Sequence, residues 1–233
     1  LKDFETENGQ LKSVTVSCDG ILKKIETNLL VLAIGHSARD TFEMLLHRQV
    51  QMEAKAFATG FRIEHPQQMI NDHQYKGADM RYLPAASYKV TANFENRRGV
   101  YSFCMCPGGY VVNASSEKGR LAVNGMSYHK RDGQNANSAV IVSVSPEDFP
   151  DAGPLGGIAF QKALEERAYQ LGKGRIPQQL YGDYVRGICS TSYGDFSSRT
   201  KGGAVFADLG RLLPEELKQS LILGVERFVG YIP

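Results

Sequence analysis

The sequence predicts an α+β fold, mainly an antiparallel sheet or partial barrel with a few helices. Short apolar or alternating segments follow one another with brief Gly, Asn or Pro-containing connections, which is typical of antiparallel strands. Two longer segments with helical apolar spacing come after them, at 154–171 and at 214–229. The expected strands after residue 52 are 54–65, 87–95, 99–106, 109–114, 121–128 and 138–145.

The beginning of the chain has its own pattern. Residues 11–18 and 21–34 alternate or run apolar, and the Asp19-Gly20 pair between the first two segments predicts a two-residue hairpin turn. The run LLVLAI at 29–34 is too short for an independent helix, so it predicts a fully buried strand. Near the other end, residues 186–212 are rich in Gly and Ser, which predicts mostly loop.

The turn after residues 29–34 contains Gly35, His36 and Ser37, with Ser37 as the expected N-cap of a following helix. A strand, a glycine turn and a helix place backbone N–H groups where an anion or a cofactor could approach. Every strand-to-helix turn has this general form, so a purely structural role explains the pattern equally well.

Composition excludes several classes of function. The chain has 233 residues, 42% of them hydrophobic, with a net charge of +2. This balance gives no electrostatic reason to expect nucleic acid or an anionic membrane as a partner. The four cysteines have the spacing neither of a disulfide framework nor of a four-ligand zinc site, so we expect a reducing, cytoplasmic setting.

Cys104 and Cys106 are the most informative pair of residues. On a regular strand they would share one face with Cα atoms about 6.5 Å apart, near the upper limit for a disulfide. We therefore expect a relaxed dithiol. Pro107, Gly108 and Gly109 follow directly, and glycine lets the backbone pass close to a ligand. Two small buried residues before a turn would give the same pattern.

Arg62 is the candidate for binding an anion. The segment FRIEHP at 61–66 alternates apolar and polar residues, so Arg62 and Glu64 share a face and His65 points the other way. An arginine can bind a substrate carboxylate or phosphate through two hydrogen bonds. An exposed sheet face with a paired charge is the alternative interpretation.

Several longer segments resemble, literally and in order, the bacterial family described as FAD-dependent or NAD(FAD)-utilising dehydrogenases. The resemblance covers most of the chain, and its segments are LAIGHSARDT at 32–41, ATGFRIEHPQ at 58–67, LPAASY at 83–88, FCMCPGG at 103–109, PLGG at 154–157 and PQQ at 177–179.

The resemblance implies an inserted domain of a Rossmann-type flavoprotein of roughly twice this length. Residues 1–40 then resemble a remnant of the FAD-binding domain, with Gly35, His36 and Ser37 at a cofactor contact, and residues 41–233 resemble the inserted substrate-side domain. The chain starts at Leu1 rather than Met, and the opening glycine fingerprint of such proteins is missing from it. We therefore expect an internal fragment whose partner is the missing FAD-binding domain.

The expected function is the substrate-side portion of an FAD-dependent oxidoreductase that acts on a small molecule. In the full-length protein we expect Cys104, Cys106 and residues 107–109 near the flavin. The fragment alone lacks most of a flavin site, so we expect it to bind no FAD and to be inactive. The alternative is a non-catalytic module that binds a ligand or partner on a flavoprotein-related scaffold.

Overall fold

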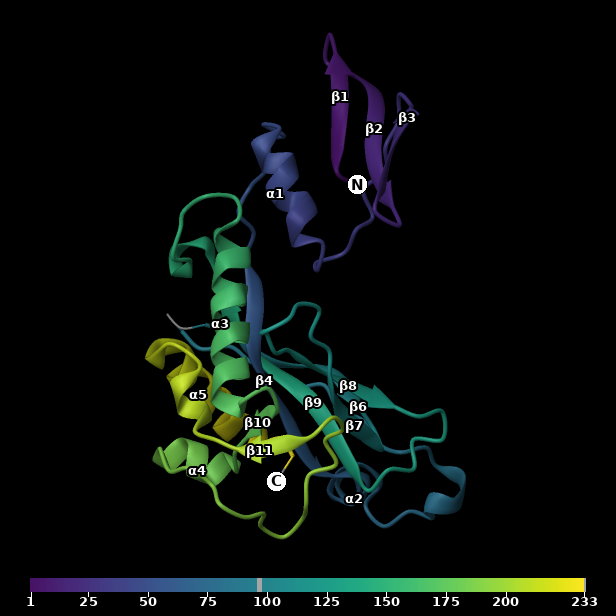
Figure 1. The fold of residues 1–233 in the computed structure, drawn as a ribbon. Helices are drawn as coiled ribbons and strands as arrows, with labels where there is room; N and C mark the ends of the chain where they lie inside the picture. Colours follow the sequence, from purple (N-terminus) through teal and green to yellow (C-terminus); the bar gives the residue numbers. More distant parts are fainter. Residues whose placement is uncertain (96–97, 233) are drawn as a thin grey trace.

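The computed structural model describes residues 1–95 and 98–232, and its fold class is α+β, as predicted (Figure 1). The strands are β1 (Asp3–Glu7), β2 (Gln10–Cys18), β3 (Ile21–Glu26), β4 (Phe57–Pro66), β5 (Thr91–Ala92), β6 (Val100–Cys106), β7 (Gly109–Asn113), β8 (Val123–Ser127), β9 (Asn135–Val144), β10 (Ile176–Gln178) and β11 (Ala204–Phe206). The α-helices are α1 (Arg39–His47), α2 (Gln67–Tyr75), α3 (Gly156–Gly172), α4 (Tyr181–Arg186) and α5 (Glu215–Val229), and short 3₁₀ turns lie at Met80–Tyr82, Pro146–Asp148 and Leu209–Arg211.

An open four-stranded sheet, ordered β4-β9-β6-β5, is the centre of the fold. All its neighbouring strands are antiparallel, and β4 and β9 pair over ten residues each, from Phe57 opposite Val144 to Pro66 opposite Asn135. Because side chains alternate along a strand, this register assigns every residue of β4 to one of two faces. Phe61 and Arg62 therefore lie on opposite faces.

Helices cover the Phe61 face. The core joins valines of β6 and β9 to apolar residues of α3 and α5, and Gly224 of α5 packs so closely on Val100 that a β-carbon at 224 would overlap that side chain. The buried core residues are Ala92, Val100, Val140, Val142, Val144, Phe149, Phe160, Leu213, Leu217, Leu221 and Phe228. Burial of this apolar face fixes the register of β4 on β9, because a slip by one residue would expose it.

The β7–β8 hairpin lies against the Arg62 face. Its residue Gly125 is in contact with the side chains of Arg62 and Asn137, which belong to β4 and β9. A loop after α4 then crosses to this hairpin, where Lys201 pairs with Val112 in parallel and its amide donates to the Val111 carbonyl. The sheet thus has helices on one face and a hairpin with a crossing loop on the other.

The N-terminal strands form a separate three-stranded antiparallel sheet, β1-β2-β3, drawn in purple in Figure 1. The hairpin predicted at Asp19-Gly20 is confirmed, with positive φ at both residues and Cys18 opposite Ile21. The buried strand predicted at 29–34 is wrong. β3 ends at Glu26, and Leu29 and Val31 are 74% and 78% exposed. An apolar run becomes a buried strand only where other strands pair with it and side chains cover it.

Helix α1 begins one residue later than expected, and Ser37 does not cap it. Its N-cap is Ala38, which makes no side-chain cap. A buried ion pair anchors the helix instead. Arg39, only 3% exposed, donates from Nη2 and Nη1 to the two carboxylate oxygens of Glu165 on α3, at 2.7 and 2.9 Å. This anchor joins α1 to the longest helix of the fold.

Some local predictions need correction. The strand expected at 87–95 is confined to Thr91–Ala92, and the short parallel pair β10–β11 was not predicted, with β11 lying inside the segment 186–212 that was expected to be mostly loop. Helix α2 was not predicted, because the polar segment QQMINDHQY carries little apolar periodicity. None of the helices in residues 1–95 and 98–232 combines the length and the apolar composition of a membrane span.

Candidate functional site

The β7–β8 side of the central sheet gathers the polar residues that the sequence singled out. Arg62 and Glu64 share this face, as predicted, and both are half-buried. The Glu64 carboxylate accepts hydrogen bonds from Asn135 Nδ2 at 2.9 Å and from the Arg199 backbone N–H at 2.6 Å. Its charge is therefore held by hydrogen bonds from β9 and from the crossing loop.

The Arg62 guanidinium is held by neutral groups from three strands. Nη1 donates to Asn137 Oδ1 and lies 3.7 Å from Cys106 Sγ. Nη2 donates to the Cys104 carbonyl at 3.0 Å and to Asn124 Oδ1 at 3.2 Å. Both terminal nitrogens are thus engaged by the chain itself. The alternative of a paired surface charge is not what the structure shows, because none of these acceptors is a carboxylate.

Cys104 and Cys106 lie on a β-bulge, so the expectation of a regular strand at this point is wrong. Phe103 pairs with Ala139 and Cys106 pairs with Asn137, which leaves one extra residue on β6. Cys104 absorbs the distortion with φ of 45°, an uncommon conformation for a residue with a β-carbon. Both cysteines are free, Cys104 is exposed, and Cys106 Sγ donates to the Cys104 carbonyl at 3.4 Å. The predicted free dithiol is therefore present.

The turn at 107–109 is buried within the chain. The Gly108 N–H donates to Gln67 Oε1 at 2.8 Å, and Ser127 Oγ donates to the Pro107 carbonyl at 2.7 Å. Gly108 has φ of 51°, and a β-carbon there would overlap the Arg131 carbonyl. Close approach of other backbone to these glycines is therefore already explained by the protein itself. Contact of this turn with a flavin stays a prediction.

Gly35, His36 and Ser37 lie elsewhere, in an exposed connection before α1. Their side-chain hydrogen bonding is local, with His36 Nε2 at 3.2 Å from Ser37 Oγ. Figure 1 shows α1 at the end of the molecule near β1–β3 and α2 at the opposite end. The bulge lies near the α2 end, because Cys106 pairs with Asn137, two residues from Asn135, and Asn135 pairs with Pro66, the residue directly before α2. The two groups of predicted site residues are not brought together.

A flavin cofactor, as the resemblance implies, would need exposed backbone at a turn. Gly35 offers it, since φ is 67° and a β-carbon there would meet no atom within 4 Å. The buried turn at 107–109 does not. The described residues thus leave open backbone at Gly35 and no enclosed flavin cradle, and contact of the 35–37 turn with FAD stays a prediction. They also gather no group of three or more His, Cys, Asp or Glu side chains that could hold a metal ion.

Sequence reasoning missed the residues that hold the site in place. Gln67 bridges the Gly108 N–H to Asn71 and the Ala86 carbonyl, all by hydrogen bonds of 2.8–2.9 Å. Asn137 is completely buried, and its Nδ2 has no hydrogen-bond partner among the described residues. Asparagines at alternate positions of a strand, as in the segment NANS at 135–138, are the signal that could have identified this polar face.

A buried His–Tyr pair lies behind the site, on the helix-covered face. His65 Nδ1 faces the Pro66 carbonyl at 3.3 Å, which can only accept, so Nδ1 carries the proton and Nε2 accepts from the Tyr88 hydroxyl at 2.9 Å. Burial lowers the pKa of His65 and raises the pKa of Tyr88 to about 12. Both side chains are therefore neutral at pH 7.

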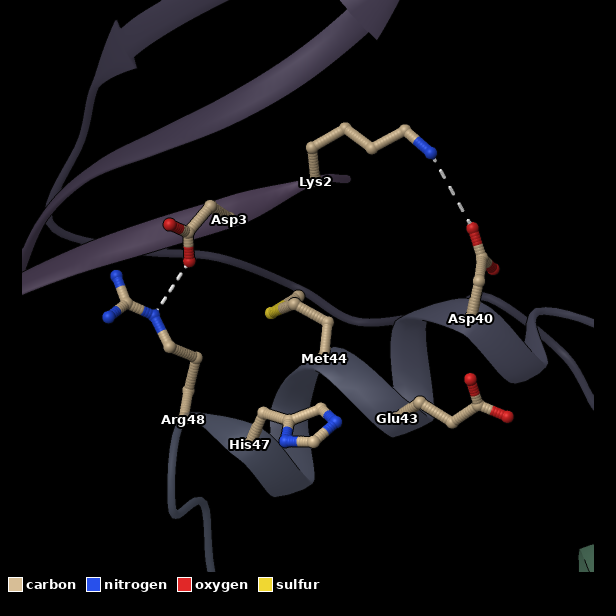
Figure 2. Close-up of a pocket in the computed structure, with 7 residues that line it drawn as sticks. All are labelled: Lys2, Asp3, Asp40, Glu43, Met44, His47 and Arg48. Carbon is tan, nitrogen blue, oxygen red and sulfur yellow. Dashed lines mark hydrogen bonds and ion pairs between the residues drawn. The ribbon is translucent and has the colours of Figure 1, made fainter.

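A surface depression lies between β1 and α1, drawn in Figure 2. Its charged residues pair across it, with Arg48 Nε on Asp3 at 2.7 Å and Lys2 Nζ on Asp40 at 3.7 Å. The depression is open to solvent, and its third acid, Glu43, pairs with Lys162 of α3, which lies outside the lining. The depression therefore joins the N-terminal sheet to α1, and each of its carboxylates, its lysine and its arginine is already in an ion pair.

Residues 56–233 match the family described as "FAD-dependent protein, C-terminal domain-like". The chain belongs to this family. The match begins one residue before β4, so it includes the bulge and Arg62 and leaves out Gly35, His36 and Ser37. The chain is also 48% identical over 232 residues to an "Uncharacterized protein" of Clostridium beijerinckii, covering 98% of the chain and 43% of that relative. The chain thus spans less than half the length of the relative it matches.

Proposed function

We propose that this chain is the substrate-side part of an FAD-dependent oxidoreductase. The observation that carries the proposal is the match of residues 56–233 to a family described by its dependence on FAD. In that setting bound FAD would supply the electron transfer, while this chain would position a small-molecule substrate and exclude water from it. The longer relative offers room for the flavin-binding part, because this chain covers only 43% of it.

Residues 1–40 are proposed to be the remnant of the FAD-binding domain, and residues 41–233 the inserted domain. The exposure of the apolar run at 29–34 supports this division. Leu29, Val31 and Leu32 are 74%, 78% and 45% exposed, and apolar side chains gathered at a surface indicate a partner that covers them. The partner proposed is the missing part of the flavin-binding domain, with FAD close to Gly35, His36 and Ser37.

The chemistry is proposed to reside at the bulge. Cys104 and Cys106 form a dithiol that exchanges electrons with the flavin or lines its pocket, and residues 107–109 lie beside the flavin ring. Arg62 attracts an anionic group of the substrate through its charge, since its terminal nitrogens are already engaged. We propose a cytoplasmic setting, where the thiols stay reduced.

A second candidate is a non-catalytic module that binds a partner. The open depression of Figure 2 and the burial of the 107–109 turn favour it, because neither provides an enclosed small-molecule site. The near-neutral charge of +2 still gives no reason to expect nucleic acid.

The deciding experiment compares the Clostridium beijerinckii relative with the 233-residue chain, each purified without added cofactor and then titrated with FAD. We expect visible flavin absorption in the relative and no FAD binding by the chain. In the relative, valine at the position equivalent to Gly35 should weaken FAD binding. Alanine at the position equivalent to Gly182, where a β-carbon in this chain meets no atom within 4 Å, should not. A relative that stays colourless in excess FAD would favour the binding module.

A further inference from the structure

Arg62 carries a positive charge that no carboxylate neutralises. Other partly or fully buried arginines of the described chain pair with acids: Arg39 with Glu165 and Arg98 with Asp148. Arg62 makes no ion pair within residues 1–95 and 98–232, and Glu64, the acid on the same sheet face, is engaged by Asn135 and the Arg199 amide. A half-buried charge without a counter-ion costs free energy unless an anion arrives at some stage of function.

The contacts of Arg62 show where such an anion can arise. Two asparagine side chains and a backbone carbonyl cannot become negative in water. The Cys106 thiol can, and its sulfur is 3.7 Å from Nη1. The position of the Cys106 sulfur beside Arg62 is also fixed, because Arg62 Nη2 and the Cys106 thiol both donate to the Cys104 carbonyl. Arg62 is therefore placed to stabilise negative charge as it develops on the Cys106 sulfur.

We propose that Cys106 is the attacking thiol of a disulfide-reducing site, that Arg62 is its fixed cation, that Cys104 is the resolving thiol, and that the substrates are disulfides carrying negatively charged groups. This inference rests on the dithiol role proposed above and adds the substrate class and the order of attack. Cys104 is exposed and Cys106 is partly exposed, so both residues lie at the surface of the chain.

The reaction balances without a further reactant. Cys106 loses its proton to solvent and its sulfur bonds to one substrate sulfur, while the substrate S–S bond breaks and the second sulfur leaves as a thiolate. Cys104, also losing its proton, then attacks Cys106 and forms a Cys104–Cys106 disulfide, releasing the first substrate sulfur. Two electrons pass from the dithiol to the substrate. Reduction of the new disulfide would be the task of the flavin in the longer protein.

The test uses the 233-residue chain with the exposed Cys18 and Cys189 replaced by serine. Its reaction is followed with two aromatic disulfides, dianionic dithiobis(nitrobenzoate) and uncharged dithiodipyridine. Each chain should release two equivalents of leaving thiol, Cys104→Ser should release one and keep a mixed disulfide, and Cys106→Ser should react slowly. Arg62→Gln should lower the ratio of the anionic to the uncharged rate by about fivefold or more, as expected for one charge at close range.

The ratio of the anionic to the uncharged rate distinguishes an effect of the Arg62 charge from a disturbed fold, because a loosened bulge would alter the rates of both reagents together. Arg62→Lys should retain most of the ratio, and Arg81→Gln, which removes an exposed arginine paired with Asp79, should leave it unchanged. An unchanged ratio in Arg62→Gln, or faster attack by Cys104 than by Cys106, would overturn the inference. No flavin is involved, so a relative without FAD would remove the flavoprotein proposal and leave this result standing.

Discussion

Gly125 of β8 faces the Arg62 guanidinium so closely that a β-carbon at position 125 would overlap Nη1. The same β-carbon would overlap Oδ1 of Asn137, the acceptor of the Nη1 hydrogen bond. A β-carbon at position 125 would therefore force these side chains to shift, and the constraint comes from them and not from backbone angles, since Gly125 has no positive φ. The β7–β8 hairpin sets the position of the arginine.

Gly125→Ala should displace Arg62 and weaken its hold on the bulge. We expect a loss of about 1 kcal/mol in the free energy of unfolding, the low end for inserting a methyl group into a filled site, because the nearest clashing atom is the end of the flexible Arg62 side chain. The anionic-to-uncharged rate ratio at Cys106 should fall as well. Urea unfolding and the disulfide assay measure the two effects. Gly182→Ala is the matched control, because a β-carbon there meets nothing within 4 Å; equal effects of both changes would refute the steric role of Gly125.

Arg39→Ala should release α1 from α3. The substitution leaves the Glu165 and Glu117 carboxylates without their cation. We expect the free energy of unfolding to fall by about 3 kcal/mol, the lower end for breaking a buried pair, because Glu165 is partly exposed. Amide hydrogen exchange should accelerate within Arg39–His47. Arg167→Ala removes an exposed arginine from α3, the helix that carries Glu165, and it should change neither the free energy of unfolding nor the amide exchange rates of α1.

The stability of the protein should fall in mild acid through His65. Burial lowers its pKa in the folded state, so below about pH 6.5, the ordinary value, the unfolded chain binds a proton that the folded chain resists. Stability is therefore complete above that pH and declines as the pH drops towards the folded pKa. Urea unfolding at pH 7.5 and pH 5.5 measures this pH dependence, and the free energy of unfolding of His65→Gln should differ less between the two pH values than that of the unchanged chain. An equal reduction of this difference by His129→Gln, at an exposed site, would contradict the assignment.

Lys201 should fasten the crossing loop to the β7–β8 hairpin. Its ammonium lies 4.3 Å from the ring centroid of Tyr110 and 4.5 Å from that of Tyr128. Lys201→Met should lower the free energy of unfolding by about 1 kcal/mol, the strength of an exposed cation–π contact. The Arg199 amide, which donates to Glu64, should then exchange faster with deuterated solvent. Lys118→Met, at an exposed position, should leave that exchange rate unaltered.

The sequence predicted best those elements whose pattern is local. Asp19-Gly20 dictates its hairpin through its own backbone preferences, and the alternation at 61–66 assigned Arg62 and His65 to opposite faces. The prediction of a buried strand at 29–34 was wrong for the opposite reason. Burial of such a run depends on neighbouring strands, and within the described residues no strand pairs with it.

The site was less predictable than the fold. The free thiols and the polar face were expected, but the bulge arises from a mismatch between β6 and β9 that alternation along one strand does not reveal. Asn124 and Asn137 contact Arg62 from strands 62 and 75 residues further along the chain. Contacts of that sequence separation leave no periodic signal.

The exposed edge of the N-terminal sheet has a consequence for the chain in solution. All six residues of β3 are exposed, Ile21 and Leu22 by 64% and 65%, and its outer edge is followed by the uncharged, proline-free run at 29–34. An unpaired edge beside such a run is a template for intermolecular β-pairing. Lys23 opposes this association by charge repulsion, while Lys24 is paired with Glu5. High salt, which screens that repulsion, should therefore drive the chain towards aggregation.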